Sequence, residues 1–199
     1  HEYDGPVSQS FASLFQEDKK NLLFVGRITP NKKIEDLIKL LSFYKKYFSP
    51  PARLIVIGNT STLPNYYHAL RDLAERLQLT SEDLFFTGHL PMEEFLAAYR
   101  KADVFVSLSE HEGFCLPLIE SCHFGLPVLA YAAGAVPETL AGAGLLLIRK
   151  DVAATAALIE LILNDAPLRK RLQQSALRRF ASYQQQARPD ILLSYLEKL

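Results

Sequence analysis

Two glutamates, Glu112 and Glu120, lie in one short stretch of the chain that also holds a glycine, a cysteine and a proline. A strand-like apolar segment from Asp103 to Leu108 precedes the stretch, and Pro117 favours the first turn of a helix. The free N–H groups and the dipole at the start of a helix attract anions. Carboxylates instead accept hydrogen bonds from neutral hydroxyl groups. The stretch therefore predicts a site for an anionic ligand that also carries hydroxyls, such as those of a ribose and a hexose.

The turn between Glu112 and Pro117 is expected to present backbone N–H groups to this ligand. The residues of the turn are Gly113, Phe114, Cys115 and Leu116. Gly113 would allow the backbone to approach a ligand closely. Taken singly, each glutamate is most often a solvated surface acid. The glycine, the proline and the flanking strands nevertheless favour a binding site for the pattern as a whole.

Two basic residues, Arg27 and Lys32, bracket a loop that follows an apolar segment from Asn21 to Gly26. Arginine offers a bidentate fork and lysine a compact charge, so the pair could clamp a diphosphate. Each charge-assisted hydrogen bond of this kind is worth roughly 1.5–3 kcal/mol. The competing interpretation is that both charges are simply solvated. Lys33 is adjacent to Lys32 and could be mistaken for the partner of Arg27.

Strand-like and helical segments alternate along most of the chain. Strands are expected at 21–26, 53–58, 84–88, 103–108, 126–131 and 145–148, and helices at 32–48, 64–79, 91–101, from 117, 137–140, 152–163, 165–183 and 189–199. This alternation predicts an α/β fold with a parallel sheet and helices on both faces. Ligands of such sheets bind outside the carboxyl ends of the strands. The segments that follow strand ends include Arg27, Gly58, Gly88 and Glu110 to Cys115, so the polar features collect at one edge.

The 199 residues fit one domain or one half of a two-domain protein. Residues 1–20 are expected to form a linker or an irregular lead-in. Residues 21–199 are expected to form one domain, whose C-terminal helices begin near residue 152. The chain starts HEYDGP without an initiator methionine, so we expect it to be a piece of a longer protein.

The composition argues against several classes of protein. The 22 basic and 22 acidic residues cancel, which disfavours a general nucleic-acid binder. No apolar run reaches the roughly 18 residues of a membrane span, no signal peptide is visible, and two cysteines are too few for a disulfide framework. We therefore expect a cytoplasmic protein, which could also lie at the inner face of a membrane. Neither the cysteines nor the histidines have the spacing of metal ligands.

The chain resembles the C-terminal, nucleotide-sugar-binding half of retaining GT-B glycosyltransferases, family four in the usual numbering. The motifs that carry the resemblance are GRITPNK at 26–32, Gly58, FTG at 86–88, EGFCLPLIE at 112–120 and GLPV at 125–128. They stand in the right order and spacing, and the resemblance extends from about Asn21 to Leu199. It implies a Rossmann-like domain that forms one half of a two-domain GT-B architecture.

The resemblance also implies an activity and its substrates. A hexose would move from a nucleotide-diphosphate sugar, such as a UDP- or GDP-hexose, to a sugar or lipid-linked acceptor in glycan, polysaccharide or glycolipid synthesis. The transfer would be a retaining, front-side displacement that uses no metal and no other cofactor. The acceptor site, and the histidine that is often catalytic in the family, would belong to an N-terminal domain. We do not expect turnover without that domain.

By the same resemblance, Arg27 and Lys32 would neutralise the donor diphosphate, and Glu120 would bind the ribose hydroxyls. Glu112 and the amides of Gly113 to Leu116 would hold the donor hexose and the distal phosphate. The residues expected to line the base are Gly88 and His89. Catalytic roles therefore fall to Arg27, Lys32 and Glu112, with Glu112 acting as a donor-site residue more than as a general base.

Three positions depart from the family pattern. Cys115 and Lys33 stand where glycine is common, and Ala133 replaces the usual glycine before Gly134. The first two should still allow the expected turns, whereas Ala133 puts a backbone contact there in question.

Two other functions stay open. A glycosidase could use the two acids, although it would need one carboxyl with a raised pKa across the sugar bond, and it would leave Arg27 and Lys32 without a role. A non-catalytic nucleotide-sugar-binding module would use the same residues and differ only in lacking transfer. Dinucleotide and ATP binding are disfavoured because neither GxGxxG nor a P-loop occurs.

Overall fold

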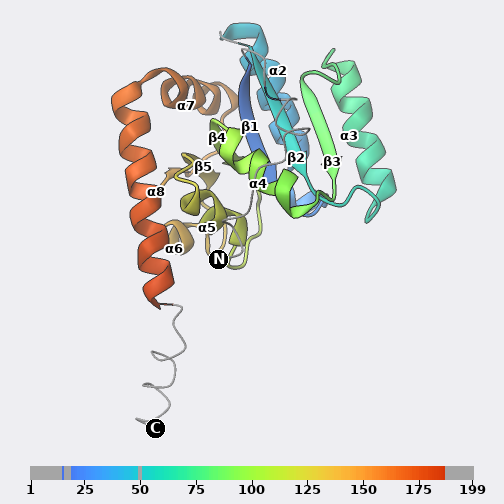
Figure 1. Cartoon of the computed structure of the whole chain (residues 1–199). Helices are drawn as coiled ribbons and strands as arrows, with labels where there is room; N and C mark the ends of the chain where they lie inside the picture. The colour runs from blue at the N-terminus through green and yellow to red at the C-terminus, as the bar shows by residue number, and fades with distance from the viewer. Residues whose placement is uncertain (1–14, 16–18, 49–50, 187–199) are drawn as a thin grey trace.

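A computed structural model describes residue 15, residues 19–48 and residues 51–186, and every structural statement below concerns these residues (Figure 1). Its centre is a six-stranded, fully parallel sheet with the strand order β3-β2-β1-β4-β5-β6. The strands are β1 Lys20–Val25, β2 Ala52–Ile57, β3 Leu84–Gly88, β4 Val104–Ser107, β5 Val128–Tyr131 and β6 Leu145–Leu147. The predicted parallel α/β sheet is confirmed.

Helices cover both faces of this sheet. They are the 3-10 turn η1 Pro30–Lys32 and the helices α2 Ile34–Tyr47, α3 Pro64–Arg76, α4 Met92–Lys101, α5 Leu116–His123, α6 Val136–Leu140, α7 Val152–Asn164 and α8 Ala166–Gln186. One apolar cluster joins the sheet to α2, α3 and α7, and a second joins it to α4, α5 and α6. The long helix α8 contributes Leu172 to the first cluster and Ala176 to the second, and it runs beside α5 (Figure 1).

Strand β1 shows why the strands read as continuous apolar runs. Leu22 and Phe24 enter the cluster on one face, and Leu23 enters the cluster on the other. Since both faces of a parallel sheet are covered, both sets of alternate residues are mostly apolar. The same strand pairs with β2 on one side and with β4 on the other.

The chain therefore reverses its direction of winding at β1. It proceeds from β1 through β2 to β3 at one edge, and then returns to place β4 on the free side of β1. A crevice opens at such a point, outside the carboxyl ends of the two strands. The loop that follows β1 carries Arg27 and Lys32, and the loop that follows β4 carries Glu110 to Cys115. The topology thus brings together two motifs that lie far apart in the sequence.

Some boundaries differ from those expected. The helix predicted from Lys32 begins at Ile34, because Lys33 adopts the left-handed conformation and separates η1 from α2. Helix α5 begins at Leu116, one residue before Pro117. Helix α3 ends at Arg76 instead of residue 79, and Gln78 in the following turn has a positive φ of 56°.

The two ends of the chain are described only in part. Strand β1 begins at Lys20, within the predicted lead-in of residues 1–20, most of which lies outside the described residues. The helix expected at 189–199 also lies outside them. No helix in the described part of the chain is long and apolar enough to cross a membrane.

Candidate functional site

A buried ion pair joins the loop after β1 to the loop after β4. The ammonium Nζ of Lys32 donates hydrogen bonds to both carboxylate oxygens of Glu112, each at 2.7 Å. The two side chains are only 13% and 6% exposed. Because removing two charges from water is costly, such a pair is held by close geometry and is strongly destabilised when one partner is lost. The structure therefore places two predicted site residues in direct contact.

The backbone of Glu112 is fixed from the side of β5. The N–H of Ala135 donates to the Glu112 carbonyl oxygen at 3.2 Å. Gly134 has a φ of +55°, and a Cβ at this position would lie 2.2 Å from the same oxygen. Only glycine fits there. The close contact belongs to Gly134 itself, so the replacement of the preceding glycine by Ala133 leaves it in place.

Two residues beside the ion pair adopt a backbone conformation that favours glycine. Lys33 has a φ of 53° and Cys115 a φ of 55°. A side chain in this left-handed region costs roughly 1–2 kcal/mol. These are two of the positions at which the sequence departs from the glycine common in the family it resembles. The turns are therefore kept, with strain that glycine would not carry.

The thiol of Cys115 lies next to the carboxylate of Glu112. Burial raises the pKa of Cys115 to about 12, and the negative charge of Glu112 adds to the effect. A thiol with this pKa is protonated at neutral pH and is a poor nucleophile. Cys115 therefore adds a small, neutral side chain to the site and no reactive thiolate.

The second glutamate of the motif, Glu120, lies one turn into α5 and is 8% exposed. The hydroxyl of Tyr99 in α4 donates a hydrogen bond of 2.6 Å to its Oε2. Tyr99 was not among the predicted site residues. In the sequence it looks like one more core residue of a helix, although a buried tyrosine hydroxyl usually has a polar partner. That partner lies on the next helix, which the sequence alone does not reveal.

The adjacent lysine, Lys33, belongs to a separate group of charges. Its Nζ lies 3.2 Å from Glu110, and Lys150 lies 3.0 Å from Glu110 and 3.3 Å from Asp36. Hydrogen bonds from Lys150 and Lys33 hold the pKa of Glu110 below its usual value. The two consecutive lysines thus pair with different acids, and Lys32 is the one that faces Glu112.

Arg27 lies at a second part of the same sheet edge. It lines a cavity of about 250 Å³ at the carboxyl ends of β1, β2 and β3. The residues around this cavity are Val25, Gly26, Arg27, Ile57, Gly58, Asn59, Gly88, His89, Leu90 and Phe95. A Cβ on Gly58 would lie 2.0 Å from the carbonyl oxygen of Gly26, so the two strands can approach this closely only with glycine. The structure thus groups Arg27, Gly88 and His89.

Three residues of the turn into α5 are open to solvent, whereas Cys115 is partly buried. Gly113 has no atom within 4 Å of the position that a Cβ would take. Phe114 and Leu116 are both 47% exposed, and the Phe114 ring lies 5.5 Å from that of Tyr183 in α8. The amides of this turn precede the helix N-terminus, where an anion is favoured.

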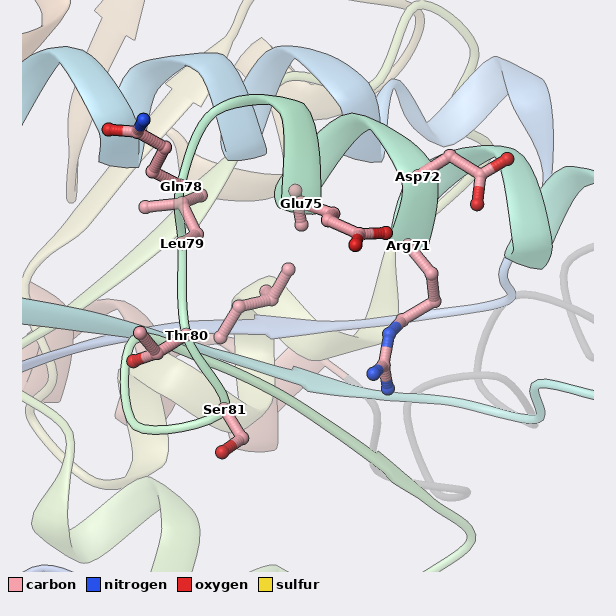
Figure 2. Close-up of a pocket in the computed structure, with 9 residues that line it drawn as sticks. Arg71, Asp72, Glu75, Gln78, Leu79, Thr80 and Ser81 are labelled. Carbon is pink, nitrogen blue, oxygen red and sulfur yellow. The ribbon is translucent and has the colours of Figure 1, made fainter.

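A larger cavity, of about 580 Å³, lies elsewhere in the molecule (Figure 2). Its labelled side chains include Arg71 and Glu75 on α3, together with Thr80 and Ser81 on the following loop. It reaches Leu84, the first residue of β3, so it lies at the amino end of that strand. None of the predicted site residues lines it.

Comparison with known proteins identifies the family. Residues 8–179 match the family described as glycosyl transferases group 1. The chain belongs to this family. Among curated proteins, it is 26% identical over 182 residues to the serotype-specific mannosyltransferase WbdA of Escherichia coli. That match covers 92% of this chain and only 22% of the relative, so the chain spans about a fifth of that protein's length.

Solved structures of glycosyltransferases share the fold. The C-terminal domain of the group 1 family protein LpcC from Francisella tularensis is 23% identical, with a TM-score of 0.72, and the match covers 89% of this chain and 94% of that domain. The Anabaena protein HepE, solved in complex with UDP and glucose, is 20% identical with a TM-score of 0.78. That match covers 98% of this chain and 54% of HepE. The predicted Rossmann-like half of a GT-B glycosyltransferase is therefore confirmed.

Proposed function

We propose that this chain is the donor-binding domain of a retaining glycosyltransferase. The enzyme would move a hexose from a nucleotide-diphosphate sugar to an acceptor. The product would be a glycan, a polysaccharide or a glycolipid. The observation that carries the proposal is the Lys32–Glu112 pair, which joins the loop after β1, whose Arg27 lines a cavity at the carboxyl edge of the sheet, to the loop that leads into α5. This is where α/β sheets of this type bind their ligands.

Each part of a nucleotide sugar has a counterpart at this edge. The cavity lined by Arg27, Gly88 and His89 would take the base, and Glu120 would accept hydrogen bonds from the ribose. Lys32 and the N-terminus of α5 would hold the diphosphate, and Glu112 would accept hydrogen bonds from the hexose.

The same groups would stabilise the transition state of transfer. As the bond between the hexose and the distal phosphate breaks, negative charge grows on the leaving diphosphate. Arg27, Lys32 and the amides that precede α5 would act as positive groups beside that charge, and fixed groups of this kind lower the barrier. They can carry the charge themselves, so the proposal requires no metal ion. The acceptor would be held by another domain of the full-length protein.

Titration calorimetry of the chain with UDP-, GDP- and ADP-sugars tests the proposal. One of these donors should bind, and Lys32→Ala and Glu120→Ala should each weaken it at least tenfold, about 1.4 kcal/mol. Lys170→Ala, which removes an exposed lysine of α8, should leave the affinity unchanged. Circular dichroism should show that all three variants are folded. Unchanged affinity in both site variants would contradict the proposed site.

A separate measurement distinguishes an enzyme from a binding module. The full-length protein, incubated with the donor that binds and with candidate sugar or lipid-linked acceptors, should release the nucleoside diphosphate and form a glycosidic bond. Binding without transfer would favour the non-catalytic module, and hydrolysis of glycosides without any nucleotide sugar would favour a glycosidase.

A further inference from the structure

The Lys32–Glu112 pair poses a problem for the ligand that it is expected to bind. Two of the three N–H donors of Lys32 point at the two oxygens of Glu112, so the cation is already neutralised. A phosphate that approaches Nζ also approaches a carboxylate whose oxygens lie 2.7 Å from it. Like charges at such distances repel, most strongly where water is excluded.

The backbone that carries Glu112 is held from two sides. Gly134 and Ala135 hold its carbonyl group from one side. On the other side, the N–H of Glu110 donates to the Asn31 carbonyl oxygen at 2.9 Å, which ties the Glu112 loop to the loop of Lys32. If Lys32 turned to a phosphate, the carboxylate of Glu112 would lose its cation at a position where its side chain is only 6% exposed. A buried charge that loses its partner is strongly destabilising.

A ligand can remove this penalty if it brings hydrogen-bond donors to Glu112. The hydroxyls of a hexose are such donors, and in a nucleotide sugar they are attached directly to the diphosphate. A nucleoside diphosphate has the same phosphates, carries additional charge on its terminal phosphate and offers no donors in place of the hexose. The diphosphate would therefore compete with Glu112 for Lys32, and it would supply no hydrogen-bond donor to the Glu112 carboxylate.

We propose that Glu112, through its ion pair with Lys32, makes the site select nucleotide sugars over nucleoside diphosphates. The inference rests on the proposed function and deepens it. Once the hexose has been transferred, Glu112 loses its hydroxyl donors and takes Lys32 back from the diphosphate. The ion pair then favours release of the spent nucleotide, so one carboxylate would act in both donor selection and product release.

The test compares each sugar nucleotide with its own diphosphate by titration calorimetry of the 199-residue chain. The probes are UDP-glucose with UDP, GDP-mannose with GDP and ADP-glucose with ADP. For the pair that binds, the wild-type chain should prefer the sugar form at least tenfold. Glu112→Gln should bind the diphosphate about tenfold more tightly than the wild type, because Lys32 is no longer neutralised, and the preference should fall about tenfold.

A matched control lies two residues away. Glu110→Gln removes an equal charge from the same loop, but Glu110 pairs with Lys33 and Lys150 and its side chain is 49% exposed. This variant should keep the wild-type preference. If Glu112→Gln does not fold, the double variant Lys32→Gln/Glu112→Gln carries the test, since it replaces the buried ion pair with two neutral amides. Its preference for the sugar form should also fall about tenfold.

The outcomes separate the two proposals. Diphosphate affinity that is unchanged or weaker in Glu112→Gln, or a wild-type preference kept in the double variant, overturns the inference and leaves donor binding standing. An equal loss of preference in Glu110→Gln also overturns it, because the effect would then come from the net charge of the loop. If the folded wild-type chain binds none of the six probes, the proposed function fails and the inference fails with it.

Discussion

At the scale of single residues, the choice between two adjacent lysines depends on one backbone torsion. The sequence identified Lys32 and Glu112 by their types and spacing, but Lys33 was an equally basic neighbour. The left-handed conformation of Lys33 ends η1 and turns its side chain toward Glu110, while Lys32 faces Glu112. A lysine in that conformation is uncommon, and no local pattern predicts it. The pairing of acids and bases was therefore beyond the reach of sequence reasoning.

Cys115 allows a direct measurement of such backbone strain. We expect Cys115→Gly to leave the free energy of unfolding unchanged or to raise it by up to about 1 kcal/mol, because the relief of left-handed strain offsets the added freedom of the unfolded chain. Urea denaturation measures the change. The control is Cys122→Gly inside α5, the helix that Cys115 precedes, where the buried side chain is lost in ordinary helical geometry. It should destabilise by about 2 kcal/mol or more. Equal losses in the two variants would contradict the explanation from strain.

At the scale of elements, the strands and helices were largely predictable, and the contacts between their loops were not. Apolar runs and amphipathic stripes revealed each strand and helix because both faces of the sheet are covered. The close approach of the Gly134 turn to the Glu112 carbonyl joins loops that follow different strands. The only sign of such a contact in the sequence is a glycine. Because glycine is also common in ordinary turns, it does not predict the contact.

Alanine substitutions at two glycines of these loops should show whether a glycine is needed for a close backbone contact or only for the flexibility of a turn. We expect Gly134→Ala to lower the free energy of unfolding by about 2 kcal/mol or more, because the new Cβ would meet the Glu112 carbonyl at 2.2 Å and φ is +55°. Gly113→Ala should change it by less than about 0.5 kcal/mol, since no atom lies within 4 Å of its Cβ position. Urea denaturation of both variants provides the comparison. A similar loss in both would show that turn flexibility, and not the close contact, decides.

An ion pair between Lys45 of α2 and Asp83, which directly precedes β3, should make the free energy of unfolding depend on pH in the acid range. Asp83 is 5% exposed, and although burial alone would raise its pKa, hydrogen bonds from Lys45 and Thr80 hold the pKa below the usual value of 3.8. A carboxyl group whose pKa is lower in the folded state than in the unfolded state stabilises the fold at pH values above the unfolded-state pKa. This stabilisation is lost as the pH falls through the folded-state pKa. We therefore expect Asp83→Asn to be less stable than the wild type at pH 6. The difference should shrink below about pH 4, as measured by urea denaturation at pH 6, 4 and 3. A constant difference would contradict this origin.

At the scale of the whole molecule, the fold class followed from the alternation of segments, whereas the strand order did not. Parallel pairing and right-handed crossovers restrict the order without choosing one. The return of the chain from β3 to the free side of β1 is what sets Lys32 against Glu112. The position of α8 was also not predictable, because its sequence shows a helix but not the partner along which it lies.

Helix α8 should matter for the site because it supports the helix at whose N-terminus the diphosphate is expected to bind. Ala176 is fully buried in the cluster shared with α5, and Arg179 Nε donates to the carbonyl oxygen of Thr139 in α6 at 2.8 Å. We expect Ala176→Leu to overpack this contact, to cost about 1–3 kcal/mol of stability and to weaken binding of the nucleotide-sugar donor.

The matched control for this prediction is Ala181→Leu, which adds the same volume at an exposed position of the same helix. It should change neither property. Thermal denaturation measures stability, and calorimetry at a temperature where both variants are folded measures donor affinity. If Ala176→Leu lost stability while donor affinity stayed at the wild-type value, α8 would hold the fold together without positioning α5. A loss of both stability and donor affinity would instead show that α8 controls the site, although it contributes none of the predicted ligand contacts. The reason would be that the turn at 113–116 presents its amides correctly only when α5 is held against the sheet.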